Sequence, residues 1–127
     1  MENLVATVVE TVTESNTALS VGSGSLKVYA TPAMLALMEK AACEAIAEIL
    51  GEGETTVGTL LNVKHVAATP VGMEVSATAE LLERDGRRYV FKVTASDESG
   101  LIGEGTHERF AVLSQKFTEK TYSKLNK

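Results

Sequence analysis

The chain has 127 residues, with 12 Lys and Arg against 17 Asp and Glu, and a net charge of −5 at pH 7. This length suits one domain with a real core, and we expect residues 1–127 to form it. The acidic balance argues against nucleic acid or a membrane surface as a partner. No apolar stretch is long enough to span a bilayer, and no signal-peptide pattern opens the chain.

Cysteine and histidine usage excludes further classes of protein. The single Cys cannot form an internal disulfide, which together with the missing signal peptide predicts a cytoplasmic protein. The two His and the Cys lie far apart without the spacing of a zinc site, so we expect no metal. There is also no glycine-rich phosphate loop and no G-x-S-x-G nucleophile elbow.

The first 30 residues predict short extended segments. Residues 4–12 are rich in Val and Thr and are typical of a strand. Residues 17–21 resemble a second extended piece. The sequence GSGS at 22–25 indicates a turn, and residues 26–30 lead into the next element.

One long helix is predicted over residues 31–51, TPAMLALMEKAACEAIAEILG. Thr31 is expected to cap its first amides, Pro32 suits the first helical position, and Gly51 is expected to end the helix in a left-handed turn. Residues 32–38 include no polar side chain, which indicates a helix wrapped by other structure.

Glu39 interrupts the apolar pattern of this helix. Helical spacing puts it in line with Leu35, Ala42 and Ile46 and about 100° from Lys40. One interpretation is an edge glutamate whose side chain reaches round to water. The other is a desolvated acid or nucleophile below the helix start. The helix pattern alone does not decide between them.

The rest of the chain alternates with period two, which predicts strands at residues 55–67, 73–83, 87–97 and 101–113. Asp85-Gly86 is a two-residue hairpin signal. A strand, a helix and four hairpin-joined strands predict an α+β fold, with one long helix across a mainly antiparallel sheet of about five strands. Such a sheet needs cover at its edges, so we expect a homodimer, or a tetramer built from dimers. The tail at 114–127 predicts a short helix or a frayed end.

His65 is the second polar residue in an apolar pattern, on the same predicted face as Val57, Leu61 and Val63. It is either a core histidine satisfied by a backbone carbonyl or a partner for Glu39 across the helix–sheet contact. A carboxylate, an imidazole and the Thr31 hydroxyl at a polarising helix start are the groups that acyl transfer requires. His107 and Glu108 are further candidates, but the neighbouring glycines leave their faces undetermined.

Three blocks of sequence, ATPAMLALMEKAACEAI, GETTVGTLLNVKHVAATPVG and GTHERFAV, resemble the hot-dog-fold acyl-CoA thioesterases in order and spacing, nearest the fluoroacetyl-CoA branch. The resemblance implies a hot-dog fold and hydrolysis of a small acyl-CoA to free acid and CoA. It implies no cofactor besides the CoA of the substrate. It also implies catalytic roles for Thr31, Glu39 and His65, with Gly58 and Arg109 close to the thioester.

The substrate pocket is less defined by the sequence. We expect Met34, Met38 and Leu61 to form part of its wall, together with a second subunit. Pro32 and the short polar segment GSGSLKVY replace a glycine and an aromatic-rich lid of the fluoroacetyl-CoA branch, so the resemblance does not name the acyl group. The candidates for binding CoA phosphates are basic residues: Arg87, Arg88, Lys64, Lys116 and Lys120.

Two other functions compete with the thioesterase. The first is a non-catalytic hot-dog module that binds CoA esters or only dimerises. The second is an enoyl-thioester hydratase or dehydratase, which needs an Asp/His pair within one segment. No such pair is visible in this chain.

Overall fold

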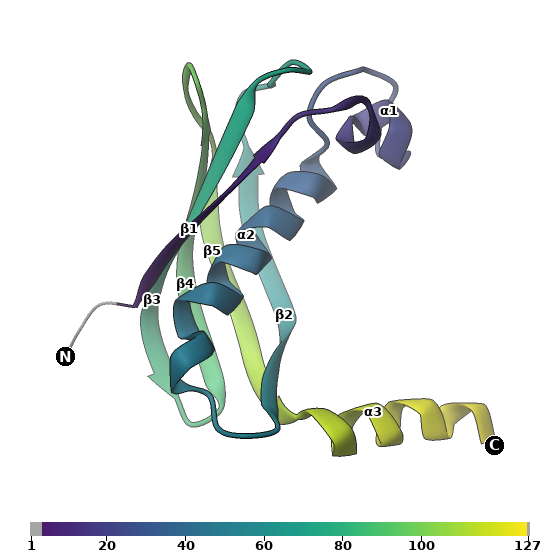
Figure 1. Cartoon of the computed structure of the whole chain (residues 1–127), viewed down its shortest axis with the longest axis vertical. Coiled ribbons are helices and arrows are strands. Elements are labelled where there is room, and N and C mark those ends of the chain that lie inside the picture. The colour runs from purple at the N-terminus through teal and green to yellow at the C-terminus, as the bar shows by residue number, and fades with distance from the viewer. Residues whose placement is uncertain (1–3, 127) are drawn as a thin grey trace.

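One antiparallel sheet of five strands curves around one long helix in the computed structural model, which describes residues 4–126 (Figure 1). The elements follow the predicted order of strand, helix and four strands: β1 (Val5–Thr11), α1 (Ala18–Val21), α2 (Thr31–Ile46), β2 (Glu54–His65), β3 (Glu74–Asp85), β4 (Arg88–Asp97), β5 (Gly100–Leu113) and α3 (Ser114–Tyr122). Short 3-10 turns at residues 14–16, 47–49 and 123–126 complete the described chain.

The strands lie in the order β1-β3-β4-β5-β2, so β1 and β2 form the two edges of the sheet. The predicted hairpins joining β3, β4 and β5 are confirmed, although the first loop is Gly86-Arg87, one residue later than expected. The prediction of a hairpin between β2 and β3 is wrong, because β2 pairs with β5. Residues 66–73 instead carry the chain from the edge strand β2 across to β3, and within them the carbonyl of Thr69 accepts from the amide of Tyr29 at 2.9 Å.

The core lies between α2 and the concave face of the sheet. The helix packs chiefly on β1 and β3, and it touches β4 and β2 far less. Alternate residues of β3 and β4 are buried beneath the helix, as predicted from the period-two pattern. The largest fully buried side chains of the core are Tyr29, Tyr89, Phe91, Met34, Met38, Ile46 and Ile102. The edge strand β2 therefore projects beyond the helix.

The prediction of an extended segment at residues 17–21 is wrong, because residues 18–21 form the short helix α1. The Thr17 side chain accepts a hydrogen bond from the amide of Ser20, and Gly22 ends the turn at φ 89°. A hydroxyl cap and a glycine stop outweigh the strand preference of Val and Thr over so short a segment.

Both predicted ends of the long helix need correction. Thr31 is the first helical residue and not the cap, since its hydroxyl bonds to another element and Ala30 precedes it without a side-chain cap. The helix ends at Ile46 and continues as a 3-10 turn to Ile49. Gly51 does not adopt a left-handed conformation; its amide donates to Glu54 Oε1 at 2.8 Å.

A bulge in β2 changes which residues face the helix. The pairing with β5 shifts between Gly58 and Leu60, so Gly58 opposes Arg109 while Leu61 opposes His107. Before the bulge the even residues face α2, and after it the odd residues do. The prediction that Val57 shares a face with Leu61 is wrong for this reason. The shift brings Gly58 onto the helix side of the sheet.

The tail forms α3, which confirms the expected short helix. It extends from the end of β5 past the side of β2, away from the rest of the fold (Figure 1). Its apolar side chains Phe117 and Tyr122 are exposed. No helix in the described part of the chain has the length and apolar character needed to cross a membrane.

Candidate active site

Thr31 and His65 meet where α2 begins and β2 ends. The Thr31 Oγ1 lies 2.7 Å from His65 Nδ1. Burial lowers the pKa of His65, which favours the neutral ring. The Nε2 atom of the ring is buried and has no hydrogen-bond partner among residues 4–126. This neutral imidazole therefore has one nitrogen bound to a hydroxyl and one nitrogen available for proton transfer.

A cavity of about 300 Å³ lies beside this pair. Small side chains dominate its lining, which consists of Ala18, Ser23, Val28, Tyr29, Thr31, His65, Val66, Ala67 and Ala68. The expected pocket wall of Met34, Met38 and Leu61 is not found here. Met34 and Met38 are 0% exposed because both point into the core, and Leu61 is half-buried on β2.

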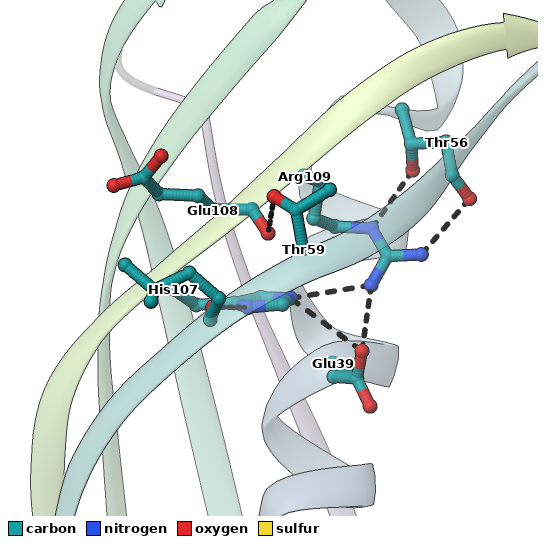
Figure 2. Close-up of polar contacts among 7 residues, drawn as sticks. Glu39, Thr56, Thr59, His107, Glu108 and Arg109 are labelled. Atoms are coloured by element: carbon teal, nitrogen blue, oxygen red, sulfur yellow. Dashed lines mark hydrogen bonds and ion pairs between the residues drawn. The ribbon is translucent and has the colours of Figure 1, made fainter.

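Glu39 belongs to a second cluster, built on Arg109 (Figure 2). Arg109 Nη1 donates to Glu39 Oε2 at 3.1 Å. Its Nε donates to Thr56 Oγ1 at 2.8 Å, and its Nη2 to the Thr56 carbonyl at 2.9 Å. Arg109 is buried, whereas the Glu39 side chain remains 37% exposed. Glu39 is therefore a fixed, ion-paired carboxylate with access to solvent, and not an edge residue that simply reaches for water.

His107 is the third member of this cluster and is 0% exposed. Its Nδ1 lies 2.8 Å from the carbonyl of Leu60, and its Nε2 lies 3.2 Å from Arg109 Nη1. A carbonyl only accepts and a guanidinium only donates, so the proton sits on Nδ1. Burial, with a smaller effect of the Arg109 charge, lowers the pKa of His107 and keeps it neutral. The 3.8 Å approach of Nε2 to Glu39 is consequently not an ion pair.

Register explains which residues of the GTHER segment enter the cluster. His107 and Arg109 share the helix side of β5, while Glu108 faces outward and pairs with Arg88 at 2.9 Å. On the helix side, Arg109 is held in its ion pair with Glu39. Thr56 was not among the sequence candidates, because its role depends on a bulge that the alternating pattern does not reveal.

Gly58 leaves room for the Glu39 carboxylate. A Cβ at this position would overlap Glu39 Oε2 and lie 3.2 Å from Arg109 Nη1. Only glycine lets the helix acid approach β2 this closely. The predicted role of the Gly58 amide at the thioester stays a prediction.

The predicted encounter of Glu39 with His65 does not occur within one chain. No hydrogen bond or ion pair joins the two in residues 4–126, because each has different partners. Thr31 and Glu39 are eight residues apart on α2, a rise of about 12 Å. Gly58 and His65 are seven residues apart on β2, a rise of about 23 Å. The predicted catalytic residues therefore form two half-sites.

Comparison with known proteins places the chain in a family. The family model for fluoroacetyl-CoA-specific thioesterases matches residues 12–115. The chain belongs to the fluoroacetyl-CoA-specific thioesterase family. A curated fluoroacetyl-CoA thioesterase of Streptantibioticus cattleyicolor is 45% identical over 98 residues, which cover 77% of this chain and 70% of the relative.

Solved structures of the fluoroacetyl-CoA-specific thioesterase family agree. A fluoroacetyl-CoA thioesterase superposes with a TM-score of 0.89 at 37% identity, covering 94% of this chain and 93% of the other. A Thermus thermophilus member of the thioesterase superfamily superposes with a TM-score of 0.88 at 31% identity, covering 99% and 93%. The predicted resemblance, the α+β hot-dog fold and the class of thioester hydrolase are confirmed.

Three of the predicted phosphate-binding candidates of this family member gather in one place. Arg87, Lys116 and Lys120 line a cavity of about 230 Å³ where α3 begins, together with Val112, Leu113 and Phe117. Arg88 is instead engaged by Glu108 and Glu83, and Lys64 lies on β2. The cavity thus concentrates positive charge on an acidic protein.

Proposed function

We propose that this protein hydrolyses small acyl-CoA thioesters, with Glu39 as its reactive acid. The observation that supports this assignment most is the Glu39–Arg109 ion pair. One carboxylate oxygen is fixed by Arg109 at 3.1 Å, while the side chain stays partly exposed. A carboxylate that is held in orientation and still reachable suits a nucleophile or a general base.

The proposed mechanism uses the start of α2 to polarise the thioester carbonyl. Free backbone amides and the helix dipole there favour the negative charge that develops on the oxygen. Glu39 either attacks the carbonyl carbon, expelling the CoA thiolate and leaving a mixed anhydride for water to cleave, or removes a proton from the attacking water. His65 carries the proton to the leaving thiolate, and Thr31 orients the carbonyl or the water.

The two half-sites favour a homodimer. The outer edge of β2 is unpaired over 12 residues and carries exposed Leu60. If two β2 strands pair antiparallel about a two-fold axis between Leu61 and Asn62, His65 of one copy lies beside Gly58 of the other. Glu39 of the second copy then lies close to the unpartnered Nε2 of His65. The expected tetramer stays a prediction.

The basic cavity supports a binding site for the CoA nucleotide. Phosphate groups pair well with arginine and lysine, and Arg87, Lys116 and Lys120 surround this cavity without an acidic side chain in its lining. The acyl group would enter the cavity beside Thr31, whose small side chains suit a short acyl chain.

The exposed thiol of Cys43 fits the predicted reducing cytoplasm.

Thiol release from a panel of short acyl-CoA esters tests the proposed function. The Glu39→Gln variant should lose on the order of 10²-fold or more in kcat, because the amide cannot attack or take a proton. Glu44→Gln, an exposed position on the same helix, is the matched control and should keep its activity. If wild-type protein releases no thiol from any ester, the non-catalytic module becomes the better reading. Unchanged turnover by Glu39→Gln would reject the role of that acid.

A further inference from the structure

A buried histidine that the proposed mechanism does not use lies behind the reactive acid. We propose that His107 is a positioning residue, which fixes the guanidinium of Arg109 and through it the carboxylate of Glu39. This inference rests on the proposed thioesterase function. His107 acts on Glu39 through Arg109, which bonds to both residues. His107 has no exposed surface through which to touch a substrate.

The two hydrogens of Arg109 Nη1 need two acceptors. One is Glu39 Oε2 at 3.1 Å and the other is His107 Nε2 at 3.2 Å (Figure 2). Two bonds to Thr56 hold the opposite side of the guanidinium. Because the group is planar, acceptors on both sides fix its rotation. Without Nε2 as an acceptor, one Nη1 hydrogen would have no partner in a buried site, and the side of the guanidinium that holds Glu39 would be less firmly fixed.

The acceptor function of Nε2 depends on the other ring nitrogen. Nδ1 donates to the Leu60 carbonyl at 2.8 Å, which keeps the proton away from Nε2. Leu60 lies at the bulge of β2, so the irregular strand selects the tautomer that Arg109 requires. The ring is further held against Phe91, with centroids 6.1 Å apart. The bulge, the histidine, the arginine and the acid thus form one chain of contacts.

A pair of variants separates positioning from simple structural support. In His107→Gln the amide oxygen lies near the place of Nε2 and can accept from Arg109, while the bond to Leu60 is lost. In His107→Asn the amide nitrogen lies near the place of Nδ1 and can donate to Leu60, while Arg109 loses its acceptor. We expect His107→Gln to keep kcat within about tenfold of wild type and His107→Asn to fall at least tenfold further, with KM little changed in both.

The opposite ranking would overturn the proposal. If His107 only ties down the bulge, His107→Asn should be the more active and the more heat-stable variant. Equal losses of kcat in the two variants would also reject a positioning role. Activities are compared at a temperature at which thermal unfolding shows both variants to be folded.

A spectrum of the wild-type protein keeps the proposal testable even if neither variant folds. Histidine nitrogen-15 NMR at neutral pH should show His107 protonated at Nδ1 and unprotonated at Nε2. A proton on Nε2 would exclude the bond from Arg109 and overturn the proposal. This readout needs no substrate, so it is independent of the proposed thioesterase activity, whose failure appears separately as absent thiol release by wild type.

Discussion

The carboxylate of Glu39 occupies the space that a side chain on Gly58 would fill. Replacing Gly58 by Ala therefore forces either the helix acid or the edge strand to move. Overpacking of this kind costs about 1–3 kcal/mol. We expect Gly58→Ala to lower kcat on the order of 10- to 100-fold, because Glu39 loses its bond to Arg109. Steady-state kinetics with acetyl-CoA measures this effect.

Gly51→Ala is the control for this substitution. A Cβ on Gly51 would make an ordinary 3.7 Å contact with Glu54, and Gly51 has no left-handed conformation to lose. That variant should match wild type in kcat and in thermal stability. An active Gly58→Ala variant would show that the close approach of Glu39 to β2 is not needed for turnover.

Two inactive variants should restore activity to each other if the half-sites combine across a dimer. Glu39→Gln spoils the acid and leaves His65 intact, whereas His65→Ala does the reverse. In a mixed dimer one of the two sites then receives both intact groups. Random mixing makes half the dimers mixed, so about a quarter of wild-type activity is expected from equal amounts after unfolding and refolding together.

Activity near zero in the refolded mixture would place both groups in one subunit and contradict the proposed arrangement. A mixture of Glu39→Gln with Arg109→Ala is the matched control, because these two residues lie in the same half-site. That pair should recover no activity in either case. Sedimentation of the wild-type protein reports separately whether it forms dimers.

The order of helix and strands could be predicted because burial alternates cleanly along β3 and β4, from Val75 to Ala95. The pairing of β2 could not, because period-two alternation shows that a segment is a strand but not which neighbour it joins. The bulge at Gly58 is equally invisible, since it keeps the residue types and changes only their faces. That is why Val57 was assigned to the wrong side and Thr56 was missed.

The candidate site shows the same limit. Glu39 and His65 each stood out because a polar side chain in an apolar pattern costs free energy unless it is paired. The pattern identified both groups but not their partners. Arg109 is the partner of Glu39, and Thr31 is the partner of His65. Helical and strand spacing determine which way a side chain points from its own element. Its partner depends on how that element packs against the others. The register of β5 decided that His107 faces inward and Glu108 outward.

Mild acid should destabilise the fold through its buried neutral histidine. Burial lowers the pKa of His107 in the folded protein, whereas the unfolded side chain titrates near 6.5. Below pH 6.5 the unfolded chain binds a proton at this histidine, whereas the folded chain does not. The contribution to stability is therefore present above pH 6.5 and is lost as the pH falls. The loss is at most about 1.4 kcal/mol per pH unit for this group. His65 acts in the same direction.

Urea unfolding at several pH values between 7.5 and 5.5 measures this dependence. His107→Gln removes one of the two histidines, so its free energy of unfolding should fall less steeply with acid than that of wild type. Parallel curves for the two proteins would mean that His107 takes up a proton in the folded state. The absolute stability of the variant does not enter the comparison, because only the slopes are compared.

Charge reversal in the basic cavity should weaken binding of the CoA nucleotide without touching the chemistry. Lys116→Glu with Lys120→Glu replaces two of its three cations by anions. We expect KM for acetyl-CoA to rise about tenfold, equivalent to about 1.4 kcal/mol, with kcat preserved. The acetyl thioester of N-acetylcysteamine lacks phosphates, so its kcat/KM should stay at the wild-type value. Lys92→Glu, at an exposed position of β4 outside the cavity lining, is the control and should leave both substrates unaffected. Equal changes for the two substrates in the cavity variant would show that Lys116 and Lys120 do not bind the phosphates.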